Sequence, residues 1–132
     1  MPQFNWQMAD VELNGLRYSL VVVPKNKLRL RITGKGNIPC AEKLKEWQAY
    51  RDQLSEILIE DGIRSIGKNA FSEFTALESI YLPSSLFRIE SGAFAGCPAL
   101  SKVYFSGTVT QLHRVRIAPD ALPAWFYRKG DD

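Results

Sequence analysis

Apolar residues recur at a fixed spacing of 23 residues in the middle of the chain. Residues 63–85 read IRSIGKNAFSEFTALESIYLPSS, and residues 86–108 read LFRIESGAFAGCPALSKVYFSGT. Identical residues occupy the same offset in six pairs: Ile66/Ile89, Ala70/Ala93, Phe71/Phe94, Ala76/Ala99, Leu77/Leu100 and Tyr81/Tyr104. A period of this length predicts a solenoid, because one coil cannot cover its own apolar side and must stack on a neighbour.

Each repeat contains one short strand by its pattern. In ESIYLP, the alternation directs Ile80 and Leu82 inward and Tyr81 outward. Strands near Ile57, Ile80 and Val103 are therefore expected to form a parallel ladder. Asn69 and Gly92 precede the Ala-Phe pair, where a tight turn can require positive φ. The predicted repeat core is Ile66, Phe71, Leu77, Ile80, Ile89, Phe94, Cys97, Leu100 and Val103.

The repeat weakens on both sides of this region. Upstream, CAEKLKEWQAYRDQ replaces the Ala-Phe turn and predicts a short helix whose apolar residues share one side: Leu44, Trp47, Tyr50 and Leu54. Downstream, Arg116 and Ile117 occupy the Ala-Phe offsets, so the repeat is expected to stop there. The tail should close the solenoid with a final strand and a short helical turn.

The N-terminal segment alternates with period two. LRYSLVVV and LRLRITG, joined by PKNK, predict a β-hairpin whose apolar face would cover the first coil. A further edge strand is expected from residues that share one face, namely Phe4, Trp6, Met8 and Val11. We predict one domain over residues 1–132, with an N-terminal β cap at 1–39, repeats at 40–108 and a C-terminal cap at 109–132.

Composition agrees with an ordinary globular protein. The chain has 132 residues, 45% hydrophobic residues and a formal net charge of +3, which is too small to identify a partner. No apolar run is long enough for a transmembrane segment, and no signal peptide is visible, so the chain as it stands is expected in the cytoplasm. Cys40 and Cys97 allow at most one disulfide, and sequence alone does not pair them.

The pattern IxxIGxxAFxxxxxLxxIxLPxS at residues 63–85 resembles the BspA-like leucine-rich repeats. Residues 16–39 also look like the β-region that often precedes these repeats. The resemblance implies an α/β solenoid, mainly β, with a right-handed coil, a parallel strand ladder and an N-terminal hairpin cap. It also implies a non-catalytic, bacterial protein-interaction module for adhesion or scaffolding, and similar proteins are often secreted or on the cell surface.

The candidate chemistry is sparse. His113 is expected in a strand without a nucleophile beside it, and Cys97 shares its offset with Phe74, which favours a small buried residue over a reactive thiol. GKGN at residues 34–37 lacks the rest of a phosphate-binding loop and is interpreted as a turn. We therefore expect no enzyme activity, no cofactor and no metal site.

Two surfaces could bind a partner. The first is the outward strand column of Leu58, Tyr81 and Tyr104 with Lys102 beside it, which favours a protein partner, including a second copy of this chain. Burial of that column under a neighbouring segment is the alternative interpretation. The second surface is a basic strand face, with nucleic acid (the less favoured) or an anionic glycan as partner: Lys27, Arg29, Arg31, Arg114 and Arg116. A solvated strand face is the simpler interpretation of those charges.

Overall fold

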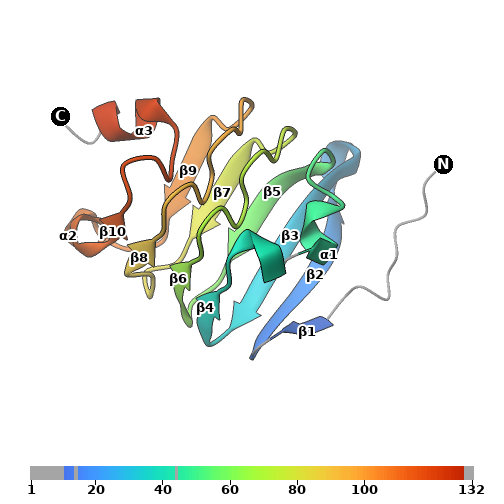
Figure 1. Cartoon of the computed structure of the whole chain (residues 1–132), viewed down its shortest axis with the longest axis horizontal. Coiled ribbons are helices and arrows are strands. Elements are labelled where there is room, and N and C mark those ends of the chain that lie inside the picture. Colours follow the sequence, from blue (N-terminus) through green and yellow to red (C-terminus); the bar gives the residue numbers. More distant parts are fainter. Residues whose placement is uncertain (1–10, 14, 44, 130–132) are drawn as a thin grey trace.

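Two β-sheets wound into one short coil form the fold in this computed structural model (Figure 1). The structure describes residues 11–13, 15–43 and 45–129. In the described residues the first sheet has the order β1-β2-β3-β5-β7-β9, with the bounds Val11–Leu13, Leu16–Val23, Lys27–Gly34, Leu54–Ile59, Ser79–Leu82 and Lys102–Phe105. The second sheet has the order β10-β8-β6-β4, with the bounds Arg116–Ile117, Arg88–Ile89, Ile63–Ile66 and Gly36–Ile38.

The coil gives one strand to each sheet at every turn. In the first sheet Ile57, Ile80 and Val103 pair in parallel register, as the repeat predicts. The second sheet is also parallel and was not predicted. Its inward residues are isoleucines in one row across the four strands: Ile38, Ile66, Ile89 and Ile117. The core lies between the two sheets, where the predicted repeat residues are buried except Val103, which is half-buried.

The C-terminal segment ends the 23-residue period and adds a final strand, as expected. That strand is β10, whose Ile117 pairs with Ile89 across 28 residues instead of 23, so the ladder continues at a longer spacing. Helix α2 (Val109–Arg114) accounts for part of the longer spacing. Thr108 is the N-cap of this helix and forms a capping box. His113 is therefore helical rather than in a strand. The expected helical turn near the end is α3 (Ala124–Lys129).

The position of the Ala-Phe pair also moves in this last coil. The amide of Phe94 donates to the carbonyl of Ala121, just as the amide of Phe71 donates to the carbonyl of Ala93. Ala121 and the adjacent Leu122 are buried. They therefore take the inward places that the fixed 23-residue period assigns to Arg116 and Ile117.

The N-terminal hairpin forms as predicted and also extends the ladder. β2 and β3 pair antiparallel around a short 3-10 helix, Pro24–Asn26. β3 then pairs in parallel with β5, with Leu30 opposite Ile57, so the hairpin continues the first sheet. β1 contains Val11 and pairs antiparallel with β2 as an edge strand. The other residues predicted for that strand, Phe4, Trp6 and Met8, lie outside the described residues.

A row of aromatic rings connects the coils through the core. Trp47, from helix α1 (Lys45–Gln48), lies parallel to Phe71 with ring centroids 5.6 Å apart, and Phe71 stacks on Phe94 at 5.3 Å. Tyr18 of β2 meets Trp47 edge-on at 4.8 Å. We call these four residues the aromatic row. Stacked rings add about 0.5–1.5 kcal/mol per pair beyond the burial of their area.

Positive backbone φ angles close the turns of this row. Asn69 (φ 56°) and Gly92 (φ 70°) have the predicted left-handed conformation. Glu73 (φ 59°) and Gly96 (φ 71°) share a second such offset that the sequence analysis missed. Because glutamate does not favour this conformation, its residue type did not indicate the turn.

We predict that Phe71→Ala lowers the free energy of unfolding by about 3–5 kcal/mol, because it leaves a cavity between Trp47 and Phe94. Urea denaturation followed by circular dichroism measures the change. Val109→Ala is the control, since Val109 is 70% exposed. A loss under about 1 kcal/mol for Phe71→Ala would contradict a buried ring at this position.

Gly92→Ala should destabilise the fold by about 1–2 kcal/mol, because a Cβ is disfavoured at positive φ. That Cβ would also overlap the side-chain oxygen of Asn69, so this side chain would have to move. Asn69→Gly is the matched variant at the equivalent turn, and it should change stability by less than about 0.5 kcal/mol. Thermal unfolding measures both variants. Equal losses of stability in Gly92→Ala and Asn69→Gly would contradict a backbone origin for the effect of Gly92→Ala.

Candidate functional site

Tyrosines form a stacked pair on the outer face of the first sheet. Leu58, Tyr81 and Tyr104 lie in register across β5, β7 and β9. The two tyrosine rings are 4.7 Å apart and nearly parallel, at 14°. Tyr104 is 45% exposed and Tyr81 is half-buried, so the column is open to a partner. We call Leu58, Tyr81 and Tyr104 the tyrosine column.

A cavity of about 440 Å³ lies along the tyrosine column, at the carboxyl ends of β5, β7 and β9. The three residues of the column line it together with Pro83 and with acidic groups at its margin, Glu60 and Asp61. Lys102, the fourth residue predicted for this surface, is exposed in the adjacent row opposite Ser79 and does not line the cavity. The site is thus an aromatic and apolar surface with a charged margin.

Ion pairs cover the strand face beside the column. Arg29 contacts Glu56 at 2.7 Å, and its guanidinium lies 5.7 Å from the centre of the Tyr81 ring. Lys27 pairs with Glu78 and Arg31 with Glu60, both at 2.6 Å. Partly exposed pairs of this kind contribute only about 0–1 kcal/mol each to stability. They do, however, neutralise the three cations on β3 that were considered for an anionic ligand.

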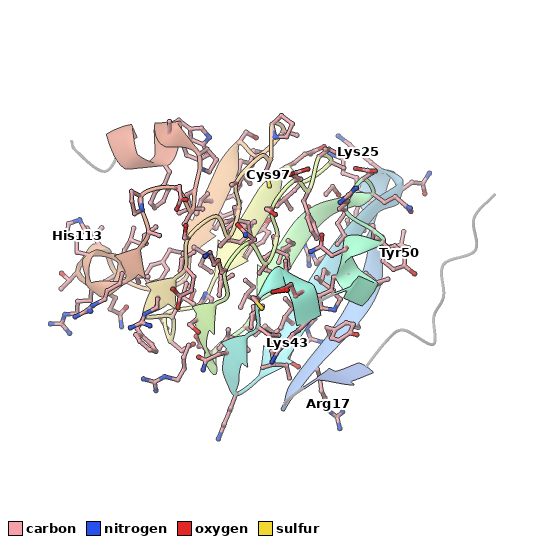
Figure 2. The ribbon with its side chains drawn as sticks, viewed as in Figure 1. Arg17, Lys25, Lys43, Tyr50, Cys97 and His113 are labelled. Atoms are coloured by element: carbon pink, nitrogen blue, oxygen red, sulfur yellow. The ribbon has the colours of Figure 1, made fainter. Side chains whose placement is uncertain are left out.

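The other two predicted basic residues lie elsewhere. Arg114 ends helix α2 and Arg116 begins β10 of the second sheet, so they do not join the cations of β3 in one surface. Figure 2 shows α2, marked by His113, at one end of the molecule, far from Lys25 beside the start of β3. The prediction of one basic face was therefore wrong, because Arg114 is not on a strand.

The remaining candidates show no reactive arrangement among the described residues. His113 is exposed on α2, and no group of three possible metal ligands occurs in the described part. Gly34 and Gly36 have positive φ and join β3 to β4, which agrees with a turn. Cys40 is half-exposed, Cys97 is buried, and both are free thiols. Burial raises the pKa of the Cys97 thiol to about 11, and the thiol donates to the carbonyl of Phe71 at 3.3 Å.

An exposed aromatic residue beside the second sheet was missed. Phe87 is 39% exposed, and the guanidinium groups of Arg64 and Arg88 lie over its ring. Phe87 falls just before a two-residue strand that the period-two pattern did not resolve. The sequence did contain one signal. Arg64 lies one repeat before Phe87, so the 23-residue period places an arginine beside the aromatic ring.

The parallel ladder and the repeat spacing define a leucine-rich-repeat solenoid. The family model for the BspA type leucine rich repeat region matches residues 42–115, and the chain belongs to this family. This confirms the resemblance seen in the sequence. Membership in this family suggests a protein-interaction module, and the BspA-type repeat is typically a non-enzymatic fold.

One solved structure shares this fold. A leucine-rich repeat protein from Eubacterium ventriosum ATCC 27560 is 26% identical, with a TM-score of 0.59 over 76% of this chain and 25% of its own length. A leucine rich cell surface protein from Faecalibacterium prausnitzii A2-165 is 17% identical, with a TM-score of 0.35 over 79% of this chain and 41% of its own. The chain thus spans less than half of either protein. The comparison with curated proteins gave no match. Within the described residues, no helix has the length and apolarity required to span a bilayer.

We predict that only one of the two thiols reacts with Ellman's reagent at pH 8 in the folded protein. Cys40 should react quickly, whereas Cys97 is buried and, with its pKa raised to about 11, remains protonated at that pH. Denaturant should expose the second thiol. Cys40→Ser is the control that assigns the fast phase, and rapid reaction of Cys97 in that variant without denaturant would contradict its burial.

Proposed function

We propose that this chain is a non-catalytic module that binds a protein partner through the tyrosine column. The observation that carries the proposal is the stacked Tyr81–Tyr104 pair, left exposed beside a cavity. Tyrosine supplies a large contact area, has few rotatable bonds, and is enriched where proteins meet. Tyr81 and Tyr104 are held by two adjacent strands, so binding costs little conformational entropy at these side chains.

The ion pairs beside the column favour protein over nucleic acid or an anionic glycan. Arg29 and Arg31 already have carboxylate partners, and a polyanion would have to displace Glu56 and Glu60 to reach them. A protein can instead lie on the tyrosine rings and leave these pairs in place at the rim, where charges mainly guide encounter and register. Lys102 is an exposed cation at this rim without an ion pair in the described residues.

The role we infer is adhesion or scaffolding, with a bacterial setting suggested by the family resemblance. The partner can be a second copy of this chain, since the same face on two copies would form a two-fold interface.

Tyr81→Ala together with Tyr104→Ala should abolish capture of the partner or self-association, because loss of two aromatic anchors weakens binding by about tenfold or more each. The experiment combines quantitative affinity capture with light scattering of the purified protein. Tyr81→Phe with Tyr104→Phe keeps both rings and should retain most binding.

Val109→Ala, an exposed change on α2, is the matched control for this experiment. Circular dichroism must show that every variant is folded. The proposal is contradicted if a folded double-alanine variant captures the same proteins, in the same amounts, and has the same oligomeric state as the parent.

A further inference from the structure

Two arginines face outward side by side on the second sheet. Arg88 of β8 and Arg116 of β10 are paired in parallel register, and the same row continues through Ser65 and Asn37. Neighbouring strands lie about 4.8 Å apart, so the two cations are adjacent. Like charges directly opposite one another are destabilising, and an anion between them would relieve that repulsion.

Arg64 belongs to the same surface through Phe87. The amide of Phe87 donates to the carbonyl of Arg64, and the amide of Arg116 donates to the carbonyl of Phe87, both at 2.8 Å. The guanidinium groups of Arg64 and Arg88 lie 5.0 and 5.6 Å from the centre of the Phe87 ring. Such cation–π contacts orient the guanidinium groups. We call Arg64, Arg88 and Arg116 the arginine cluster.

The arginine cluster is poorly compensated, in contrast to the cations of β3. Within the described residues its nearest ion-pair partner is Glu90, whose carboxylate lies 3.5 Å from Arg88. Arg64 and Arg116 form no ion pair with any described residue, and both are exposed. Three arginines with one carboxylate near them therefore leave positive charge available to an anionic partner at this place on the second sheet.

A groove of about 330 Å³ lies beside the arginines. Arg88 and Arg116 line it together with Glu90, and its apolar lining consists of Ile117 and Ala118, which are half-buried, and Ile89, which is buried. A ligand that fits must therefore combine negative groups with an apolar group. Its negative groups must also avoid Glu90, which restricts how it lies in the groove.

We propose that the arginine cluster is a second binding surface, which takes an acidic peptide segment of a partner protein. Carboxylates pair with Arg88, Arg116 and Arg64, and one apolar side chain of the peptide enters the groove. Guanidinium groups match carboxylates in a two-point geometry, which makes these contacts specific as well as attractive. The surface lies on the other sheet from the tyrosine column, so it does not depend on the function proposed above.

The aromatic residue argues for a peptide over single-stranded nucleic acid. Proteins that bind single strands present open aromatic rings on which bases stack. The Phe87 ring already has two guanidinium groups over it, so it does not offer a free platform. The half-buried Ile117 and Ala118 in the lining of the groove likewise suit an apolar side chain better than a phosphate backbone.

Fluorescence anisotropy with synthetic peptides tests this proposal. The probe is a labelled ten-residue peptide with one central leucine and glutamates alternating with serines on both sides. Its control has glutamine for each glutamate. We expect saturable binding of the acidic peptide below about 100 μM protein at low salt, and much weaker binding of the glutamine peptide.

Arg88→Gln with Arg116→Gln should weaken binding by about tenfold or more. Lys43→Gln with Arg51→Gln removes the same charge from exposed residues near α1 and should change it less than about twofold. Figure 2 shows Lys43 well away from the end that carries His113.

Three results would overturn the proposal: no saturable binding of the acidic peptide, equal weakening by the two double variants, or tighter binding of oligothymidylate or heparin than of the peptide. Tyr81→Ala with Tyr104→Ala should leave peptide binding unchanged, which separates this test from the test of the tyrosine column.

Discussion

Stacking of one coil on the next is the constraint on which the rest of this structure depends. A single coil leaves its apolar interior open at both ends, and here the aromatic row closes that interior by placing Phe71 between Trp47 and Phe94. Once these rings are in contact, the strands on either side are brought into parallel register, and the outward residues follow as rows. Both candidate surfaces are consequences of that register: the tyrosine column on one sheet and the Arg88–Arg116 pair on the other.

The two outer faces differ in how their charges are satisfied. On the first sheet each cation of β3 meets a carboxylate from a later coil, so this face presents tyrosines among neutralised pairs. On the second sheet the arginine cluster has one distant carboxylate for three cations. A net charge of +3 does not distinguish these cases, because it reports a sum and not a distribution.

Repetition made the first sheet predictable from the sequence, whereas the shortness of its strands hid the second sheet. The pairs Phe71/Phe94 and Tyr81/Tyr104 fixed both the inward and the outward positions, and the tyrosine column followed directly. The strands of the second sheet are only two to four residues long, too short for alternation to be recognised. Ile117 was missed because helix α2 lengthens the last coil, and the ion pairs of β3 were missed because Glu56 and Glu78 approach it only after the coils stack.

Nuclear Overhauser contacts measured by NMR test the stacked coil most directly. The account predicts contacts from the ring protons of Phe71 to both Trp47 and Phe94, together with backbone contacts from Ile80 to both Ile57 and Val103 in the pattern of parallel strands. Antiparallel contacts between Ile80 and Val103, or rings of Phe71 and Phe94 that contact water instead of each other, would contradict it.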